Sequence, residues 1–226
     1  MKPLENQPNL TEQVHRAILD EIAGGMLRPG SRIIQERIAQ ELGVSRQPVQ
    51  QALMLLRKQG VLRDAPGRGL LVAPLDLDYV RQMYEMRAMI EGLAFRKAAE
   101  RNAATARAEG PALIAAGRRA VAENSVTAMI AADVAFHGFI YRLSENRLIA
   151  PAMETHWTHA QRVMGEVLMR DEQPRNIWDQ HQSMLDAVAR GDGDEAERLA
   201  RRHILEAAEF MIGRLQAAAS EAVIAG

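Results

Sequence analysis

Apolar residues recur along most of the chain at helical spacing, so the sequence predicts a mostly α-helical protein. The first predicted helix has an apolar residue at every fourth position, the period of one buried helical face: Leu10, Val14, Ile18 and Ile22. A second short helix is predicted over residues 35–43, and a third is capped at its start by Ser45. Gly43 lies between them, where a glycine permits a tight turn.

After the third helix the pattern changes its period. Two short β-like runs, at residues 61–63 and 70–73, flank the sequence DAPGRG, which is rich in turn-forming residues. Three helices followed by a hairpin, with a glycine turn between the second and third helices, are typical of a winged helix-turn-helix. In that fold the third helix enters the major groove of DNA. We therefore predict a DNA-binding domain over residues 1–74.

The third helix of this domain carries hydrogen-bond donors at its start, on the side opposite its apolar face. Arg46, Gln47 and Gln50 are suited to phosphates and to base edges. Each one alone could be an ordinary solvent-exposed residue. The ordered set of helix, glycine turn, capped helix and basic hairpin favours DNA contact instead.

The predicted hairpin and the second helix add two more cations. Arg68 lies between Gly67 and Gly69 at the hairpin tip, and the glycines would let the backbone approach DNA closely. Arg37, on the second helix, would reach the flanking phosphates or a base. These residues extend the predicted DNA-binding surface to the wing.

Residues 75–226 are predicted to form a second, all-helical domain. Six helices are indicated, over residues 76–101, 104–123, 126–144, 147–170, 173–190 and 193–219. The sequence AEGP interrupts the second of them, and RGDGD precedes the last.

Four ionisable residues interrupt the apolar faces of three of these helices. Asp133 and His137 lie four positions apart, so they project from the same face of the third helix. His181 interrupts the apolar face of the fifth helix, and His203 that of the sixth. Burying a polar group without a partner costs about 2–7 kcal/mol, so these side chains need partners.

One metal ion would serve all four side chains. A carboxylate and three imidazoles suit a divalent ion such as Zn²⁺, Mn²⁺ or Ni²⁺, and leave open positions on a five- or six-coordinate ion. A single buried histidine is more often a hydrogen-bonded core residue, and an Asp–His pair four residues apart could be an internal pair. Their coincidence on three helices favours the metal site.

Arg87 also lies on a predicted apolar face, so its guanidinium needs a carboxylate partner. Two partners are open: an internal glutamate, or a carboxylate ligand held between Arg87 and the metal. We favour the ligand, which makes Arg87 a candidate effector-binding residue.

Charge and composition limit which surface can contact DNA and which residues can bind a metal. The chain has a net charge of −1, but the first 74 residues carry +3 and the remainder −4, which fits a local DNA-contacting surface. Without cysteine, any metal site must use His, Asp, Glu or water. No run of 18 apolar residues and no apolar signal core are found, so we expect a cytoplasmic protein without a membrane span.

Several segments resemble a known family. The sequences PGSRIIQERIAQELGVSRQPVQQALMLLRKQGVL and GRGLLV resemble the DNA-binding domain of the GntR family of bacterial transcription regulators. The sequences YEMRAMIEGLA, DVAFHGFIY and HQSMLDAVARGDGDEAERLARRHI resemble the helical FCD effector domain of its FadR-like branch. Six helices rather than seven are more similar to the VanR-type subgroup.

The resemblance implies a role for each candidate residue. Positions that contact DNA in the family are matched by Arg37, Ser45, Arg46, Gln47, Gly67 and Arg68. Metal-ligand positions are matched by Asp133, His137, His181 and His203, and a position that often meets an acid effector by Arg87. Gln50 departs from the family, where arginine is common, so the operator sequence is in doubt.

The family also implies partners. It implies a homodimer on a near-palindromic DNA operator, most often a repressor of neighbouring catabolic or transport genes, released by a small organic acid. Three alternatives stay open: a regulator for which the metal is the signal, a regulator with a purely structural metal, and a helical metalloenzyme. Against the enzyme, no further carboxylate or tyrosine on these faces stands out as a general base.

Overall fold

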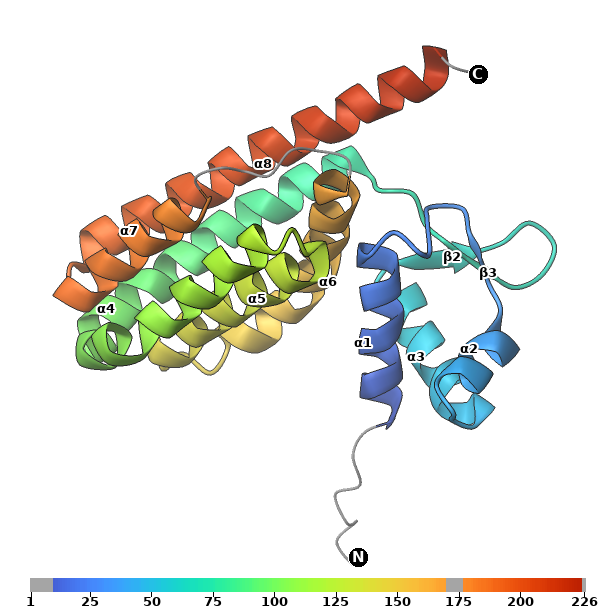
Figure 1. Cartoon of the computed structure of the whole chain (residues 1–226), viewed down its shortest axis with the longest axis horizontal. Coiled ribbons are helices and arrows are strands. Elements are labelled where there is room, and N and C mark those ends of the chain that lie inside the picture. The colour runs from blue at the N-terminus through green and yellow to red at the C-terminus, as the bar shows by residue number, and fades with distance from the viewer. Residues whose placement is uncertain (1–9, 170–176, 225–226) are drawn as a thin grey trace, which may run out of the picture. The chain divides into compact units, whose positions relative to one another are not determined.

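A computed structural model describes residues 10–169 and 177–224 of the chain (Figure 1). It divides into two compact units, residues 1–75 and 76–226, called here the N-terminal unit and the C-terminal unit. The boundary predicted from the sequence lies one residue earlier. Residues 170 and 173–176, which were predicted to be helical, lie outside the described residues.

The N-terminal unit is a winged helix-turn-helix. Its elements are α1 (Leu10–Ala23), β1 (Arg32–Ile33), α2 (Gln35–Glu41), α3 (Arg46–Lys58), β2 (Leu62–Asp64) and β3 (Leu70–Val72). The strands form an antiparallel sheet in the order β1-β3-β2, with Leu71 opposite both Arg32 and Arg63. Strand β1 was not predicted, because two residues show no periodicity.

One apolar core holds these elements together. Most of its side chains come from the predicted faces of α1 and α3 and from the hairpin: Val14, Ile18, Ile22, Val49, Ala52, Leu53, Leu56, Val61, Leu62 and Val72. Gly43, with a φ of +62°, lies in the turn between α2 and α3. Ser45 occupies the N-cap position of α3 in extended conformation, but its hydroxyl makes no capping hydrogen bond. The outer face of α3 is therefore fixed by packing rather than by its cap.

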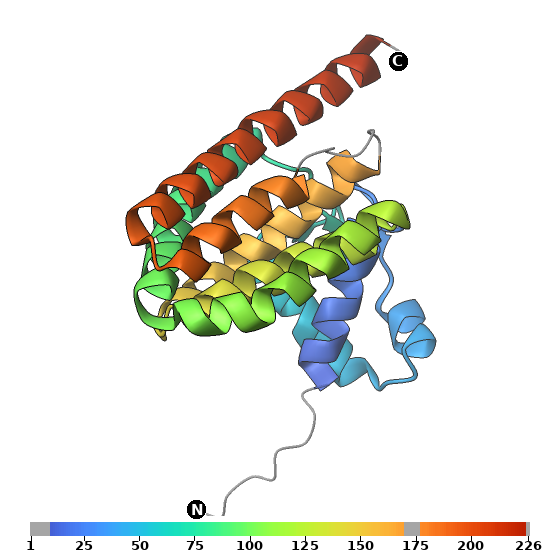
Figure 2. The ribbon, with the colours of Figure 1, turned by 60° about the vertical axis from the view of Figure 1, so that its left-hand side comes forward.

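The C-terminal unit is a helical bundle. Its helices are α4 (Leu77–Ala122), α5 (Val126–Leu143), α6 (Ile149–Leu168), α7 (Ile177–Arg190) and α8 (Gly193–Ile224). Helix α4 runs through the bundle and packs against α5, α7 and α8 (Figure 2). The core helix α5 meets the length and composition of a membrane span, and its Phe136, His137 and Ile140 are buried in this bundle.

Within the described residues this unit has six helical segments, as predicted, because α4 consists of two helices joined across a kink. The first two predicted helices, over residues 76–101 and 104–123, are the two parts of α4, and non-helical backbone at Asn102 (φ −135°, ψ 35°) separates them. There the Asn102 side chain donates a hydrogen bond to the carbonyl of Leu143 at the end of α5 (2.8 Å). The predicted interruption at AEGP was wrong, since α4 continues through Pro111.

Two glycines of α4 explain why that interruption is absent. A Cβ on Gly110 would lie 2.4 Å from Leu185 of α7, and a Cβ on Gly117 would lie 2.0 Å from the Trp178 ring. These glycines serve close helix packing rather than a turn. Tertiary contacts with α7 therefore override the local signal of glycine and proline.

Candidate functional site

The predicted DNA-contacting residues of α2 and α3 are all at the surface. Ser45, Arg46, Gln47 and Gln50 are exposed at the start of α3, on the side away from the core. Arg46 lies 3.5 Å from Glu36, with 71% of its side chain exposed. An ion pair of this kind is screened by water and salt, so a DNA phosphate can replace it.

Arg37, like Arg46, forms an ion pair at the protein surface. It donates a hydrogen bond to Glu41 one turn along α2 (2.7 Å), and 72% of its side chain is exposed. The structure thus presents Arg37 and Arg46 to solvent from adjacent helices. It contains no DNA, and their contact with an operator stays a prediction.

The wing is built around backbone that only glycine adopts readily. Gly67 and Gly69 have φ values of +88° and +96°, and Arg68 between them is exposed. Arg32 of β1 donates hydrogen bonds to the carbonyls of Pro66 and Arg68 (3.3 Å each). Sequence patterns missed Arg32, because its role depends on the pairing of β1 with β3.

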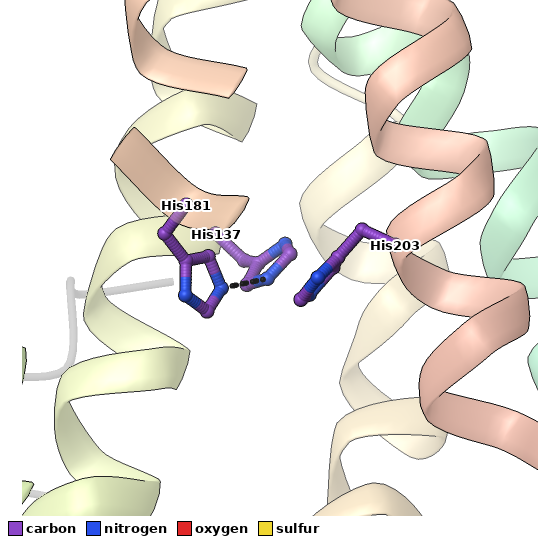
Figure 3. Close-up of side chains that lie close together, drawn as sticks. All are labelled: His137, His181 and His203. Carbon is purple, nitrogen blue, oxygen red and sulfur yellow. Dashed lines mark hydrogen bonds between the residues drawn. The ribbon is translucent and has the colours of Figure 1, made fainter. Parts of the chain in front are cut away.

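In the C-terminal unit, three buried histidines gather from three helices. His137 of α5, His181 of α7 and His203 of α8 each offer a ring nitrogen, and these atoms all lie within 4.8 Å of one another. Figure 3 shows the three rings close together, with His137 and His181 joined through their Nε2 atoms (3.3 Å). The sequence predicted this convergence from the polar interruptions alone.

Asp133 completes the group, called here the donor cluster: Asp133, His137, His181 and His203. Its Oδ1 lies 3.2 Å from His181 Nε2 and 3.9 Å from His137 Nε2. Burial alone would raise the pKa of Asp133, but its hydrogen bond to His181 and the nearby imidazoles lower it, so the carboxylate is ionised at neutral pH.

The donor spacing fits a metal ion. Donors bound to one tetrahedral zinc ion at 2.0–2.1 Å lie about 3.3–3.4 Å apart. The distances from His181 Nε2 to His137 Nε2 (3.3 Å) and to Asp133 Oδ1 (3.2 Å) match that spacing, and the distance from Asp133 Oδ1 to His137 Nε2 is wider at 3.9 Å. Burial lowers the pKa of both His181 and His203, which keeps the two rings neutral and able to act as ligands.

His137 is supported from behind by a buried ion pair. Its Nδ1 contacts Glu91 Oε2, and the other oxygen of Glu91 accepts a hydrogen bond from Arg87 Nε (2.9 Å). Burial would raise the pKa of Glu91, but His137 and Arg87 outweigh it and lower that pKa to about 2. Glu91 is thus an acceptor, so His137 carries its proton on Nδ1 and turns Nε2 toward the donor cluster.

The interpretation of Arg87 changes with this geometry. Of the two partners left open by the sequence, the internal glutamate is present as Glu91, and the guanidinium also lies over the Trp157 ring (4.4 Å to the centroid). Sequence reasoning had not identified Glu91 or the buried Tyr84 and Tyr141 as features of the site. A carboxylate with a pKa of about 2 is a poor general base at neutral pH.

Aromatic rings form a shell on the His137 and His181 side of the donor cluster. The Phe136 and Trp178 rings lie 4.7 and 4.6 Å from the His181 ring, and the Phe95 and Trp157 rings lie 5.9 and 5.4 Å from that of His137. This shell keeps water away and strengthens the electrostatic interactions inside it.

A small surface pocket reaches the cluster at His203. It has a volume of about 180 Å³ and lies between α7 and α8. His203 contributes to its wall together with Gln180, Ser183, Arg202 and Glu206. The pocket offers one arginine, the carboxylates of Asp179 and Glu206, and polar groups beside one of the candidate metal ligands.

Comparisons with known proteins cover both units. Residues 10–72 match the family described as bacterial regulatory proteins, gntR family, and residues 82–206 match the FCD domain. The chain is 24% identical over 210 residues to the HTH-type transcriptional repressor RspR of Escherichia coli K12, covering 91% of this chain and 92% of that protein.

Two solved structures share the fold. One is E. coli McbR/YncC, with a TM-score of 0.81, 21% identity and coverage of 91% of this chain and 98% of that one. The other is a putative GntR transcriptional regulator from Rhodococcus sp. RHA1, with a TM-score of 0.75, 22% identity and coverage of 90% and 97%. At these identities the similarity establishes the fold alone.

Proposed function

Because the chain belongs to the gntR family of bacterial regulatory proteins and carries an FCD domain, we propose that it is a metal-containing repressor that leaves its operator when a small carboxylate effector binds. Family membership makes it a DNA-binding transcriptional regulator and not an enzyme. The repressor role is supported by its similarity to RspR. Such a regulator acts on DNA in the cytoplasm.

The exposed donors of the N-terminal unit support operator binding. Arg46, Gln47 and Gln50 face outward from α3 as a base-reading surface would require, while Arg37 and Arg68 supply cations on either side of them in the sequence. The proposed operator is near-palindromic, because a homodimer presents two such surfaces related by symmetry.

An exposed apolar stripe on α4 supports the homodimer. Met86, Met89 and Leu93 follow helical spacing and have relative exposures of 52%, 57% and 41%. Arg201 of α8 contacts Met89, and Leu205 one turn later is also exposed. Contiguous exposed apolar residues of this kind mark protein interfaces, and a second copy of the chain is the partner we propose.

The donor cluster carries the proposal of metal control. Four candidate donors from α5, α7 and α8 are gathered in a buried shell, with Glu91 orienting one of the rings. A divalent ion held by Asp133, His137, His181 and His203 would supply a Lewis-acidic centre to which an effector carboxylate can bind. The chain's own residues hold the donors in place and exclude water.

Two features are candidates for the effector's second contact. The pocket beside His203 offers Arg202 and Ser183, and an acid bound there would have to replace Glu206 as the partner of Arg202 (3.7 Å). Arg87 is the candidate predicted from sequence, and an acid would reach it only by replacing Glu91. Any effector must prefer one arrangement of the DNA-binding units over the other in order to change operator affinity.

Operator release tests the proposal directly. Binding of the homodimer to DNA from its own upstream region is measured by fluorescence anisotropy, with the metal-loaded protein and a series of small hydroxy, keto and dicarboxylic acids. We expect at least one acid to weaken binding in the metal-loaded protein only. Arg202→Gln and Arg87→Gln variants then identify which arginine contacts the acid. Operator binding that no acid alters would contradict effector control.

The metal sensor is a second candidate. The pocket beside His203 is smaller than the roughly 300–1,000 Å³ of common ligand sites. This favours a regulator in which the ion itself is the signal. Reversible loss of DNA binding on chelation, with no organic compound required, would support the sensor. DNA binding that ignores both chelation and acids would indicate a structural metal.

A further inference from the structure

The histidine of α8 in the donor cluster has an outer partner that sequence patterns gave no reason to notice. His203 Nδ1 lies 2.8 Å from Gln180 Oε1, the amide oxygen of the residue just before His181 on α7. The amide nitrogen of Gln180 in turn donates to Glu206 Oε2 of α8 (3.0 Å). The three side chains form a short relay from the buried ring to the surface, where half of the Glu206 side chain is exposed.

The polarity of this relay follows from its outer end. An ionised carboxylate only accepts hydrogen bonds, so Glu206 selects the amide nitrogen of Gln180. The amide oxygen must then face His203, and an oxygen acceptor there requires the proton of the imidazole to lie on Nδ1. His203 Nε2 then carries a lone pair, as a metal ligand requires.

We propose that Gln180 is a positioning residue that fixes the tautomer and orientation of His203 for metal binding, and that Glu206 orients Gln180. The inference rests on the proposed metal site and assigns part of its affinity to two residues outside the donor cluster. A neutral imidazole can carry its proton on either nitrogen. The Nε2–H tautomer would direct a proton, instead of a lone pair, at the metal position.

The three histidines therefore differ in how they are supported. His137 is backed by the Glu91 carboxylate, and His203 by the neutral amide of Gln180. His181 Nδ1 is buried and has no hydrogen-bond partner among the described residues. Outer partners of metal-bound histidines commonly account for about 10–100-fold in metal affinity. We assign an effect of this size to Gln180.

The metal-free protein provides the first test. Histidine labelled with ¹⁵N reports which ring nitrogen carries the proton, in the parent and in Gln180→Met, which keeps length and removes the acceptor. We expect His203 to be the Nδ1–H tautomer in the parent and a mixture in the variant. Gln182→Met is the matched control, because Gln182 lies on the same helix and bonds to Asp186 (2.8 Å). An unchanged His203 tautomer in Gln180→Met overturns the inference.

Zinc affinity provides the second test, by competition with a chromogenic chelator. Gln180→Met should bind Zn²⁺ about 10–100-fold more weakly than the parent, while Gln182→Met should match it. Gln180→Glu combined with Glu206→Gln should restore affinity, because the carboxylate at position 180 accepts from Nδ1–H and the amide at position 206 can donate to it. Zinc binding by Gln180→Met within twofold of the parent overturns the inference.

Two outcomes keep the inference separate from the proposed function. If the parent binds no zinc, manganese or nickel, the proposed function fails, and the ¹⁵N measurement alone decides the role of Gln180. If Gln180→Met does not fold, Glu206→Ala at its exposed position replaces it in both measurements. That variant should show a mixed His203 tautomer with a smaller loss of zinc affinity, and parental behaviour in both would refute the relay.

Discussion

The two units each contain an arginine–glutamate pair with the same spacing and opposite surroundings. Arg37 and Glu41 of α2 lie 2.7 Å apart with 72% and 57% of their side chains exposed. Arg87 and Glu91 of α4 lie 2.9 Å apart with 3% and 0% exposed. The exposed pair is easily exchanged for another partner such as a phosphate, whereas the buried pair cannot lose one member without leaving a charge in the interior.

Ion-pair geometry alone does not reveal the role of an arginine–glutamate pair. At the surface, Arg37 is exposed to solvent, and its contact with DNA stays a prediction. In the interior, the pair positions His137 and is part of the fold.

Removing the buried carboxylate should have the greatest effect. Glu91→Gln leaves the Arg87 charge buried without its counter-ion, so the free energy of unfolding should fall by about 3–5 kcal/mol. Glu41→Gln is the matched control and should change stability little. Urea unfolding of both variants measures the difference. If the two variants were equally stable, the buried pair would contribute no more to stability than the exposed pair, contrary to this prediction.

The same variant has a defined pH dependence. Glu91 has an ordinary pKa of 4.5 and a pKa of about 2 in the folded protein. Its contribution to stability is therefore complete above pH 4.5 and is lost as the pH falls toward 2. The stability difference between the parent and Glu91→Gln should narrow over that interval. A difference that widens with acid would contradict an ionised Glu91.

Metal addition should give the next largest effect. Zinc at 100 times its Kd should raise the free energy of unfolding of the parent by about 2.7 kcal/mol. His181→Ala should show no such increase and should retain no metal on elemental analysis. His15→Ala in the N-terminal unit is the control and should respond like the parent, since His15 bonds to Gln59 (2.8 Å) and not to the donor cluster. A full zinc response in His181→Ala would exclude that ligand.

Loss of a base contact should follow. Arg46→Ala should weaken operator binding by about 1–3 kcal/mol and relax specificity at one base pair, if Arg46 makes a bidentate base contact. Arg147→Ala removes the same charge from the C-terminal unit and should leave operator binding unchanged. Affinities measured against single-base operator variants separate base reading from phosphate contact. Unchanged operator affinity would refute the role of Arg46.

The smallest effect concerns the departure from the family at α3. Gln50→Arg adds one cation beside the proposed DNA surface, so the slope of log K against log salt should steepen by about 0.9. Anisotropy titrations at several salt concentrations measure it, with Gln13→Arg on α1 as a charge control. An unchanged slope would place position 50 away from the phosphates.

Much of the fold could be predicted because the apolar residues of its helices recur at a regular spacing. Helical periodicity located α1, α3 and the bundle helices, and turn residues located the wing. Strand β1 has only two residues, and its existence depends on β3. The sequence AEGP was misread because Gly110 packs against Leu185, a residue 75 positions away whose proximity no local pattern reveals.

The donors of the candidate site could be predicted from the sequence, but the residues that support them could not. Its histidines and Asp133 stood out because they replace apolar residues at buried positions. Glu91 was not singled out, because several glutamates could have been the partner of Arg87. Only the structure shows which of them it contacts. Gln180 lies beside the inward face of α7, where a glutamine is unremarkable, and only the packing of α8 against α7 gives it a partner.

The close approach of Gly117 to Trp178 means that the donor cluster depends on a residue outside it. Trp178 lies one turn before His181, and its indole occupies the space that any side chain at position 117 would need. A methyl group added at position 117 would push α7 outward. The ring nitrogens of His181, which lies on α7, would then move away from the other donors. If the donor cluster holds a metal ion as proposed, variants at position 117 should lose metal affinity, although residue 117 is not one of the donors.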